Sequence, residues 1–260
     1  MGRTLQALIF DVDGTLADTE RDGHRVAFNR AFAEVGLPWE WSVERYGALL
    51  STGGGKERLL RYIAEDQPTF VPQPEAKTWA AAIHQIKTQH YKHIMQMGLI
   101  PLRPGVARFI HAARSQGVRL AIATTSAPAN AIALLETAFA PEAPQWFEVI
   151  AAGDVVTAKK PAPDIYRYAL QALDLAPDCC LAIEDSHQGL MAATQAGLKT
   201  VITRSHYTQD EDFAAAALVL DHLGEPEQPF TVFSTPAPTA TYLDLPLAEQ
   251  ILTGNLDERA

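Results

Sequence analysis

The chain has 260 residues, of which 47% are hydrophobic and 20% charged, and its formal net charge is −10. No apolar run reaches the roughly 18 residues that a membrane-spanning helix needs. The negative charge argues against a nucleic-acid-binding protein that neutralises phosphates over a broad surface. We therefore expect neither a membrane nor a nucleic acid as partner, and the sequence leaves protein partners unknown. Length alone predicts either one large domain or one domain with a smaller companion.

The cysteine pattern and the N-terminus bear on the compartment. Cys179 and Cys180 are adjacent, whereas a disulfide-stapled domain needs several separated cysteines, so a reducing compartment is expected. The segment before Asp11 holds one positive charge and about six apolar residues, too short a run for a signal peptide. We expect a cytoplasmic protein, or one of the plastid stroma if the source is a plant and a transit peptide has been removed.

The first predicted element is a strand over residues 5–10. Residues 20–98 then carry helical patterns at 25–35, 57–64 and 75–97 and no convincing strand, which indicates a helical cap inserted after the first strand. From residue 99 the chain alternates between the two patterns, with strands predicted at 119–123, 147–151, 180–183 and 200–203 and helices at 106–115, 130–139, 164–173 and 189–196, the last ended by Gly197.

This alternation predicts an α/β fold with a doubly wound parallel sheet, a Rossmann-like core, and the helical cap as an insertion. We expect residues 1–19 and 99–225 to form the core and residues 20–98 the cap. Residues 226–260 contain five of the 17 prolines and no lysine, a composition typical of an extended tail rather than a packed element.

Ligands of such sheets bind beyond the carboxyl ends of the strands, and polar residues gather at those positions. Lys160 lies between two of these positions in the chain, just before a helix whose start is marked by prolines. The residues that converge on this edge are Asp11, Asp13, Thr124, Thr125, Lys160, Glu184 and Asp185.

These residue types suit phosphoryl transfer. A carboxylate such as Asp11 can attack phosphorus, and Asp13, two residues on, can protonate the leaving oxygen and later accept a proton from water. The hydroxyl and backbone N–H groups of Thr124 and Thr125 suit phosphate oxygens. Lys160 and a Mg²⁺ ion held by the oxygens of Asp11, Asp13 and Asp185 would supply positive charge.

The motif Asp-x-Asp-Gly-Thr, then a threonine, a lysine and a Glu-Asp pair, resembles the haloacid dehalogenase superfamily of phosphohydrolases, in the subgroup whose cap follows the first motif. The resemblance implies that Asp11 is the nucleophile and a magnesium ligand. It implies that Asp13 is the acid and base, with its backbone carbonyl on the metal. Asp185 would complete the metal site, with Glu184 ligating or orienting it.

The same resemblance implies that Thr124 and Lys160 bind the phosphate group that is transferred. Longer strings, Gly53-Gly54-Gly55-Lys56-Glu57-Arg58 and Lys159-Lys160-Pro161-Ala162-Pro163-Asp164, look like the CbbY-type proteins, which are close to β-phosphoglucomutase. This likeness covers about residues 5–224 and not the tail. It implies an Mg²⁺-dependent phosphatase for xylulose-1,5-bisphosphate, an inhibitor of Rubisco, and a link to carbon fixation.

The glycine string does not fit a nucleotide-binding P-loop, because Glu57 follows Lys56 where serine or threonine is required. We expect Gly53, Lys56 and Arg58 to bind the second phosphate of a bisphosphate, the alternative being a hinge loop with surface charges. Glu20 is expected to bind sugar hydroxyls, or else to stabilise the first turn of a helix.

Three functions stay open at this point: the sugar-phosphate phosphatase, a phosphosugar mutase, and a non-catalytic phosphosugar-binding module. His24 lies one position out of register with the catalytic histidine of β-phosphoglucomutase, which weakens the case for a mutase. The complete set of acidic residues and Lys160 argues against the third. The regional charges accommodate an anionic substrate, because residues 20–98 carry 10 − 9 = +1, whereas residues 221–260 carry 1 − 7 = −6.

Overall fold

The computed structural model describes residues 4–52, 54–235 and 237–256. The chain divides into two compact units, one formed by Met1–Asp18 with Pro101–Ala260 and the other by Thr19–Ile100. Among the described residues, every helix is too short or too polar to cross a bilayer.

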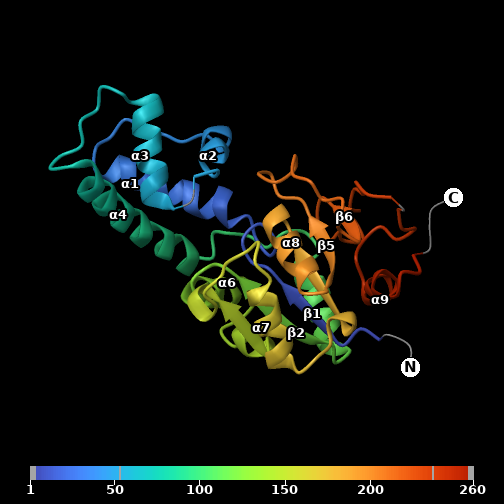
Figure 1. The fold of residues 1–260 in the computed structure, drawn as a ribbon. Coiled ribbons are helices and arrows are strands. Elements are labelled where there is room, and N and C mark those ends of the chain that lie inside the picture. Colours follow the sequence, from blue (N-terminus) through green and yellow to red (C-terminus); the bar gives the residue numbers. More distant parts are fainter. Residues whose placement is uncertain (1–3, 53, 236, 257–260) are drawn as a thin grey trace. The chain divides into compact units, whose positions relative to one another are not determined.

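The first unit contains a six-stranded sheet in the order β3-β2-β1-β4-β5-β6, and every neighbouring pair is parallel (Figure 1). The parallel α/β prediction is therefore confirmed. The strands are β1 (Ala7–Phe10), β2 (Arg119–Thr124), β3 (Val149–Ala152), β4 (Cys180–Glu184), β5 (Lys199–Thr203) and β6 (Leu218–Leu220). Strand β6 was not predicted, because its three residues are too few for a pattern.

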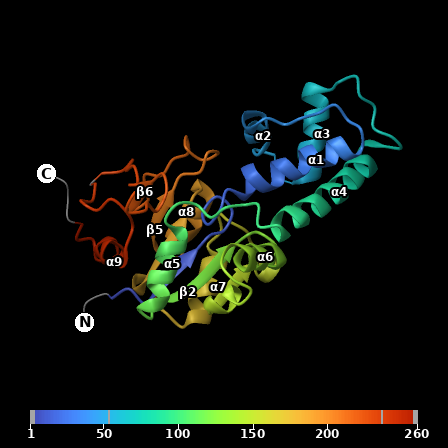
Figure 2. The same ribbon diagram turned by 180° about the vertical axis from the view of Figure 1, so that it is seen from behind.

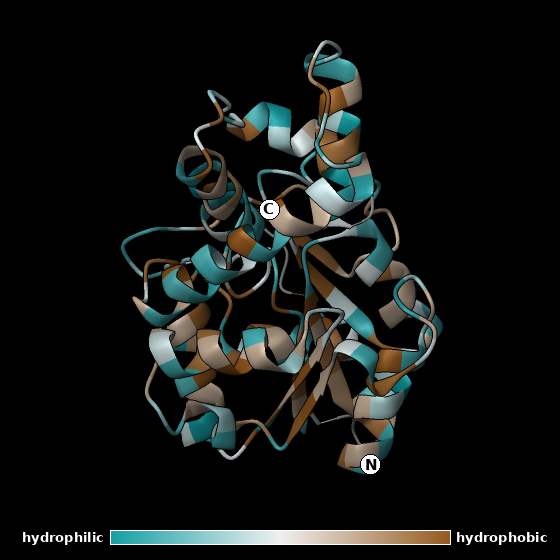
Figure 3. Cartoon of the chain, turned by 90° about the vertical axis from the view of Figure 1, so that its left-hand side faces the viewer, coloured by the Kyte–Doolittle hydropathy of each residue, from teal (hydrophilic) through white to brown (hydrophobic). Residues whose placement is uncertain are grey.

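Helices cover both faces of this sheet, which explains why the strand residues are apolar on both sides. Helices α7 (Asp164–Leu173) and α8 (His187–Gln195) pack together on one face, and α6 (Pro128–Ala138) contacts β3. Helix α5 (Val106–Ser115) lies on the opposite face (Figure 2). Short 3₁₀ turns are η2 (Ala143–Trp146), η3 (Gly153–Val155) and η4 (Pro177–Cys179). Figure 3 shows the strands as predominantly hydrophobic, whereas the helices around them carry both hydrophilic and hydrophobic residues.

The prediction of an extended C-terminal tail is wrong. Helix α9 (Leu245–Thr253) contacts α5 and β4, and it buries Leu247 and Ile251. Before it, the chain runs antiparallel to the edge strand β6 through the Leu220–Val232 bridge and the hydrogen bond from Phe233 N to Val219 O (2.8 Å). The segment therefore covers an otherwise unpaired sheet edge, which is why it packs in spite of its prolines.

In the second unit the regular secondary structure of the described residues, 19–52 and 54–100, is entirely helical. A π-helical turn, η1 (Thr19–His24), leads into α1 (Arg25–Glu34), followed by α2 (Val43–Leu49), α3 (Gly55–Asp66) and α4 (Ala76–Gln96). Helix α2 was not predicted; Ser42 caps it by accepting a hydrogen bond from Arg45 N (3.1 Å). Aromatic rings fill the interior, with Phe28 and Trp41 at a centroid distance of 4.7 Å.

Candidate active site

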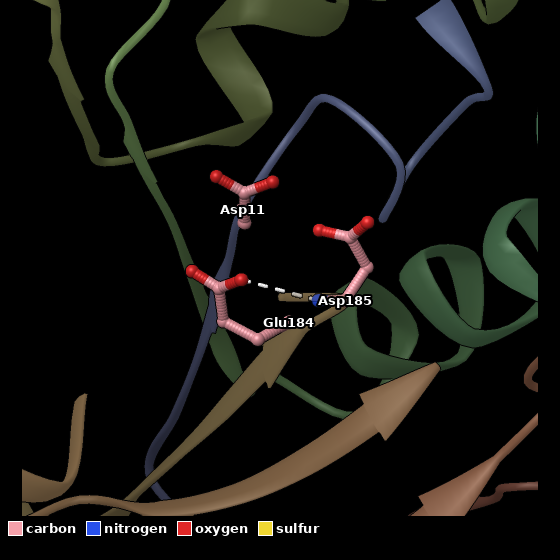
Figure 4. A group of neighbouring side chains, drawn as sticks. All are labelled: Asp11, Glu184 and Asp185. Atoms are coloured by element: carbon pink, nitrogen blue, oxygen red, sulfur yellow. Dashed lines mark hydrogen bonds between the residues drawn. The ribbon is translucent and has the colours of Figure 1, made fainter. Parts of the chain in front are cut away.

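The carboxyl ends of β1, β2 and β4 meet at one edge of the sheet, because these three strands are parallel neighbours. Asp11 follows β1, while Glu184 ends β4 and Asp185 follows it. Figure 4 shows that the side chains of these three residues point into one common space. One carboxylate oxygen from each lies within 4.8 Å of the others, and all three residues are buried.

Lys160 lies among these carboxylates. Its Nζ is 2.6 Å from Asp11 Oδ1 and 2.5 Å from Glu184 Oε1, and only 6% of its side chain is exposed. Burial lowers the pKa of Lys160, but the charges and hydrogen bonds of Asp11 and Glu184 outweigh burial and hold that pKa above its ordinary value. The ammonium therefore stays charged, and it links the ends of β1 and β4.

Glu184 is held from several sides. Its Oε1 also accepts a hydrogen bond from the Tyr166 hydroxyl (2.7 Å), and its Oε2 accepts from Asp185 N (3.1 Å). Ser186 donates to the same Oε2 (3.3 Å). A Cβ at Gly189 would overlap the Glu184 carboxyl group, so helix α8 can approach this closely only with glycine there.

Burial, together with the neighbouring charges, changes the pKa values of the carboxyl groups in the site. Burial raises the pKa of Asp11 to about 8, although the charge of Lys160 opposes this effect. Burial, with the charges of Asp11 and Glu184, holds the pKa of Asp185 well above its ordinary value. Three buried carboxylates against one ammonium leave a deficit of positive charge, which a divalent cation would fill. Their oxygens are hard donors of the kind that Mg²⁺ prefers.

The turn after β1 carries Asp13. Gly14 N donates to Ala17 O (2.8 Å), and Gly14 has φ = +87°, a backbone conformation that favours glycine. A Cβ at Gly14 would also overlap the Asp185 carboxylate. Asp13 is half-buried, and its Oδ2 accepts a hydrogen bond from the Ser126 hydroxyl.

The two threonines after β2 differ in exposure. Thr124 is fully buried, and its Oγ1 accepts a hydrogen bond from Ser126 N (3.1 Å), whereas Thr125 is exposed. Sequence reasoning missed Ser126 as a contact of Asp13 and Tyr166 as a contact of Glu184. Ser126 lay within the motif Thr-Thr-Ser, but Tyr166 is a helix residue that only packing brings to the site.

The predicted cap residues lie in the helical unit. Glu20 Oε2 accepts from the Tyr46 hydroxyl (2.5 Å) and lies 3.6 Å from Arg58 Nη1, which donates to the same Tyr46 oxygen (3.0 Å). Lys56 is exposed in the first turn of α3. Gly53 lies outside the described residues. Glu20, Tyr46 and Arg58 thus form one polar cluster, of which only Tyr46 was not predicted.

His24 has a place within the same unit. Its Nδ1 lies 2.6 Å from Lys87 Nζ, and its ring stacks on Tyr91 at a centroid distance of 3.9 Å. The imidazole is therefore engaged in packing and a hydrogen bond inside the helical unit.

Comparison with known proteins identifies close relatives. A family model described as haloacid dehalogenase-like hydrolase matches residues 5–197. Protein CbbY of Cupriavidus necator is 48% identical over 225 residues, which cover 86% of this chain and 88% of the relative. Protein CbbY of Rhodobacter capsulatus is 53% identical over 212 residues, covering 82% of this chain and 91% of the relative.

Solved structures agree with these relatives. The crystal structure of a CbbY mutant from Rhodobacter sphaeroides in complex with xylulose-1,5-bisphosphate matches with a TM-score of 0.71 at 46% identity. The match covers 84% of this chain and 95% of that protein.

Proposed function

Because the chain belongs to the haloacid dehalogenase-like hydrolase family, we propose that it is an Mg²⁺-dependent phosphatase of sugar phosphates that works through an aspartyl-phosphate on Asp11. The substrate we propose is xylulose-1,5-bisphosphate, because a similar CbbY protein has been solved in complex with that bisphosphate. The observation that carries the chemistry is the contact between the buried ammonium of Lys160 and the Asp11 carboxylate (2.6 Å).

In the first step, the Asp11 carboxylate attacks phosphorus and the sugar oxygen leaves. The nucleophile has to be ionised, and the Lys160 ammonium favours the ionised form. The same ammonium offsets negative charge when the phosphoryl group arrives. Glu184, held by Tyr166, keeps Lys160 oriented toward Asp11.

Asp13 is the proposed general acid and base. It protonates the leaving sugar oxygen in the first step and accepts a proton from the attacking water in the second. The Ser126 hydroxyl, which donates to Asp13 Oδ2, orients the carboxyl group. Thr124 and Thr125 are proposed to contact the oxygens of the transferring phosphate, from the end of β2 and the loop before α6.

The proposed Mg²⁺ ligands are Asp11, Asp185 and the backbone carbonyl of Asp13. Glu184 would ligate or orient the ion; its hydrogen bonds to Lys160 and Asp185 N favour orientation. When bound, Mg²⁺ supplies positive charge to the phosphoryl oxygens and to the carboxylates that burial otherwise destabilises.

For the second phosphate we propose Gly53, Lys56 and Arg58 as ligands, with Glu20 for sugar hydroxyls. Arg58 Nη1 and Nε already donate to Tyr46 and to Thr52 O (3.1 Å), which hold its guanidinium in one orientation. A fixed guanidinium binds phosphate with less loss of side-chain entropy than a free one.

A substrate panel tests this function. Xylulose-1,5-bisphosphate and β-glucose 1-phosphate are incubated with the protein, with and without Mg²⁺, and free phosphate is measured against isomerised sugar. We expect Mg²⁺-dependent phosphate release from the bisphosphate. Isomerised sugar without phosphate would identify a mutase, and binding without either product would identify a binding module.

The Asp11→Asn variant tests whether Asp11 is the nucleophile. It keeps the shape of the side chain and removes the nucleophile, so turnover should fall below about one thousandth of the wild-type value while the fold persists. Appreciable residual turnover would mean that water attacks phosphorus directly.

A further inference from the structure

Arg103 lies at the point where the chain returns to the sheet-containing unit, three residues after Ile100. Its side chain is 9% exposed. Its two terminal nitrogens lie within hydrogen-bonding distance of five acceptor atoms, with one hydrogen of Nη1 shared between two of them. The acceptors are Gly14 O, Thr203 O (2.8 Å), Thr203 Oγ1 (3.1 Å), Arg204 O (2.7 Å) and Asp221 O (2.6 Å). Four of these five acceptors are backbone carbonyls.

These carbonyls come from three separate places at the carboxyl edge of the sheet. Gly14 belongs to the turn after β1, Thr203 ends β5, and Asp221 follows β6. One planar guanidinium therefore ties three strand ends together. A lysine ammonium is a point charge without this fork of donors, and it could not reach all of these oxygens at once.

The contact with Gly14 bears on the acidic residues. Gly14 directly follows Asp13, and its backbone lies against the Asp185 carboxylate so closely that a Cβ would overlap it. The hydrogen bond from Arg103 fixes the peptide between Gly14 and Thr15. Gly14 is therefore next to both acidic groups, bonded to Asp13 through the chain and in close approach to Asp185.

Arg103 also ties the two segments by which the chain leaves and re-enters this unit. Arg103 N donates to Leu16 O (2.8 Å), Ala17 pairs antiparallel with Leu102, and Arg103 Nε lies 3.7 Å from Asp18 Oδ1. Arg103 therefore holds the turn that carries Asp13 at three points, Gly14, Leu16 and Asp18, all of which follow Asp13 in the chain.

We propose that Arg103 is a positioning residue for phosphoryl transfer, which holds the Gly14 peptide and through it Asp13 and Asp185 in reacting geometry. This inference rests on the proposed function, and it adds a residue that touches neither substrate nor metal. A small displacement of the acid relative to the leaving oxygen slows chemistry more than it weakens binding.

The test compares Arg103→Met and Arg103→Lys with Arg108→Met. Arg108 is the matched control, because it also donates to backbone carbonyls, Leu223 O (3.3 Å) and Gly224 O (2.7 Å), and contacts Glu225, yet it touches no part of the turn after β1. Amide hydrogen exchange of residues 12–17 is measured in the metal-free proteins. Phosphate release is then measured with Mg²⁺, below the melting temperature of every variant.

We expect both Arg103 variants to accelerate exchange in residues 12–17 and to lower kcat about 10- to 100-fold, with KM changed by less than about threefold. Arg108→Met should leave the exchange rate of residues 12–17 and kcat unchanged, even if it lowers the melting temperature. Added guanidinium should restore part of the activity of an Arg103→Ala variant. If Arg103→Met does not fold, Arg103→Lys, which keeps the positive charge, is compared with Arg108→Met instead.

Unchanged exchange in residues 12–17, or a kcat within about twofold of wild type, would overturn the proposal. Equal kcat losses in Arg103→Met and Arg108→Met would show that Arg103 only stabilises the fold, and would also overturn the proposal. A wild-type protein that releases no phosphate would instead refute the proposed function. In that case the exchange measurement, which needs no turnover, still decides whether Arg103 holds the turn.

Discussion

The Ser126 hydroxyl donates a hydrogen bond to Asp13 Oδ2, across 113 positions of sequence. Ser126 also donates its backbone N–H to Thr124 Oγ1 (3.1 Å), so its own position is fixed by the end of β2. The carboxyl group proposed as acid and base is thus oriented by a side chain of the neighbouring loop. Its orientation does not depend on the turn after β1 alone.

Replacing Ser126 with alanine should lower kcat about tenfold, because the Asp13 carboxyl group would rotate away from the leaving oxygen more often. Steady-state phosphate release measures the effect, and KM should change less than kcat. Ser115→Ala is the control, since Ser115 is exposed and donates only to Ala112 O at the end of α5. Equal activity of the two variants would show that Asp13 needs no support from Ser126.

Mg²⁺ should raise the melting temperature, and the rise should grow with pH. In the metal-free protein the pKa of Asp11 is about 8, because burial disfavours its charged form. Below that pH the ion has to displace a proton from Asp11, so its affinity falls roughly tenfold per pH unit well below the pKa.

Differential scanning fluorimetry at pH 6.5 and pH 8.5, with and without Mg²⁺, measures the difference. The larger shift is expected at pH 8.5, where Asp11 is mostly ionised. In the Asp185→Asn variant the shift should shrink at both pH values, since one hard anionic ligand is lost. A shift that is the same at both pH values, or unaffected in Asp185→Asn, would place the ion elsewhere.

Replacing Lys56 with alanine should raise KM for xylulose-1,5-bisphosphate about tenfold or more, because a charge-assisted hydrogen bond contributes about 1.5–3 kcal/mol. Hydrolysis of a simple monoester should change little, since it carries no second phosphate. Lys77→Ala, at an exposed position of the same helical unit, serves as control. An equal loss for both substrates would contradict the assignment of Lys56 to the second phosphate.

His84 should make stability fall as the pH drops below about 6.5. Burial, followed by the charges of Lys87 and Lys56, lowers the pKa of His84 below its ordinary value of 6.5. The unfolded chain therefore takes up the proton first. The stability contribution of neutral His84 is complete above pH 6.5 and is lost as the pH falls from there toward the lower, folded-state pKa.

Urea unfolding of wild type and His84→Gln at pH 7.5 and pH 5.5 checks this sign. The wild type should lose more free energy of unfolding than the variant, by at most about 1 kcal/mol, because solvent screens a half-buried ring. His93→Gln, at an exposed position of the same helix α4, controls for the loss of a histidine. A greater loss in His84→Gln would reverse the expected effect.

The sequence alone predicted the parallel sheet and the polar residues at its edge. Buried parallel strands are apolar over their whole length, so β1, β2 and β4 were recognisable as apolar runs that stop at Asp11, Thr124 and Glu184. Because the carboxyl ends of such strands share one edge, the meeting of these residues followed from the alternation of strands and helices.

Local composition misled the interpretation of the C-terminal segment. Its prolines and its lack of lysine indicated an extended tail, yet Asp244 caps α9 by accepting from Leu247 N (2.8 Å), and Gly254 ends it with φ = +81°. These capping signals were present in the sequence. The local sequence pattern could not show that β6 is an edge strand with which this segment pairs.

Strand pattern and motif order thus determined which residues this protein brings to the sheet edge, because both are local properties of the chain. Only the tertiary structure decided how they are held: Ser126 on Asp13, Tyr166 on Glu184, and Arg103 on the Gly14 carbonyl. Each of these contacts joins residues from different elements. A hydrogen bond between elements depends on packing distances of a few ångströms, which periodicity along one segment does not encode.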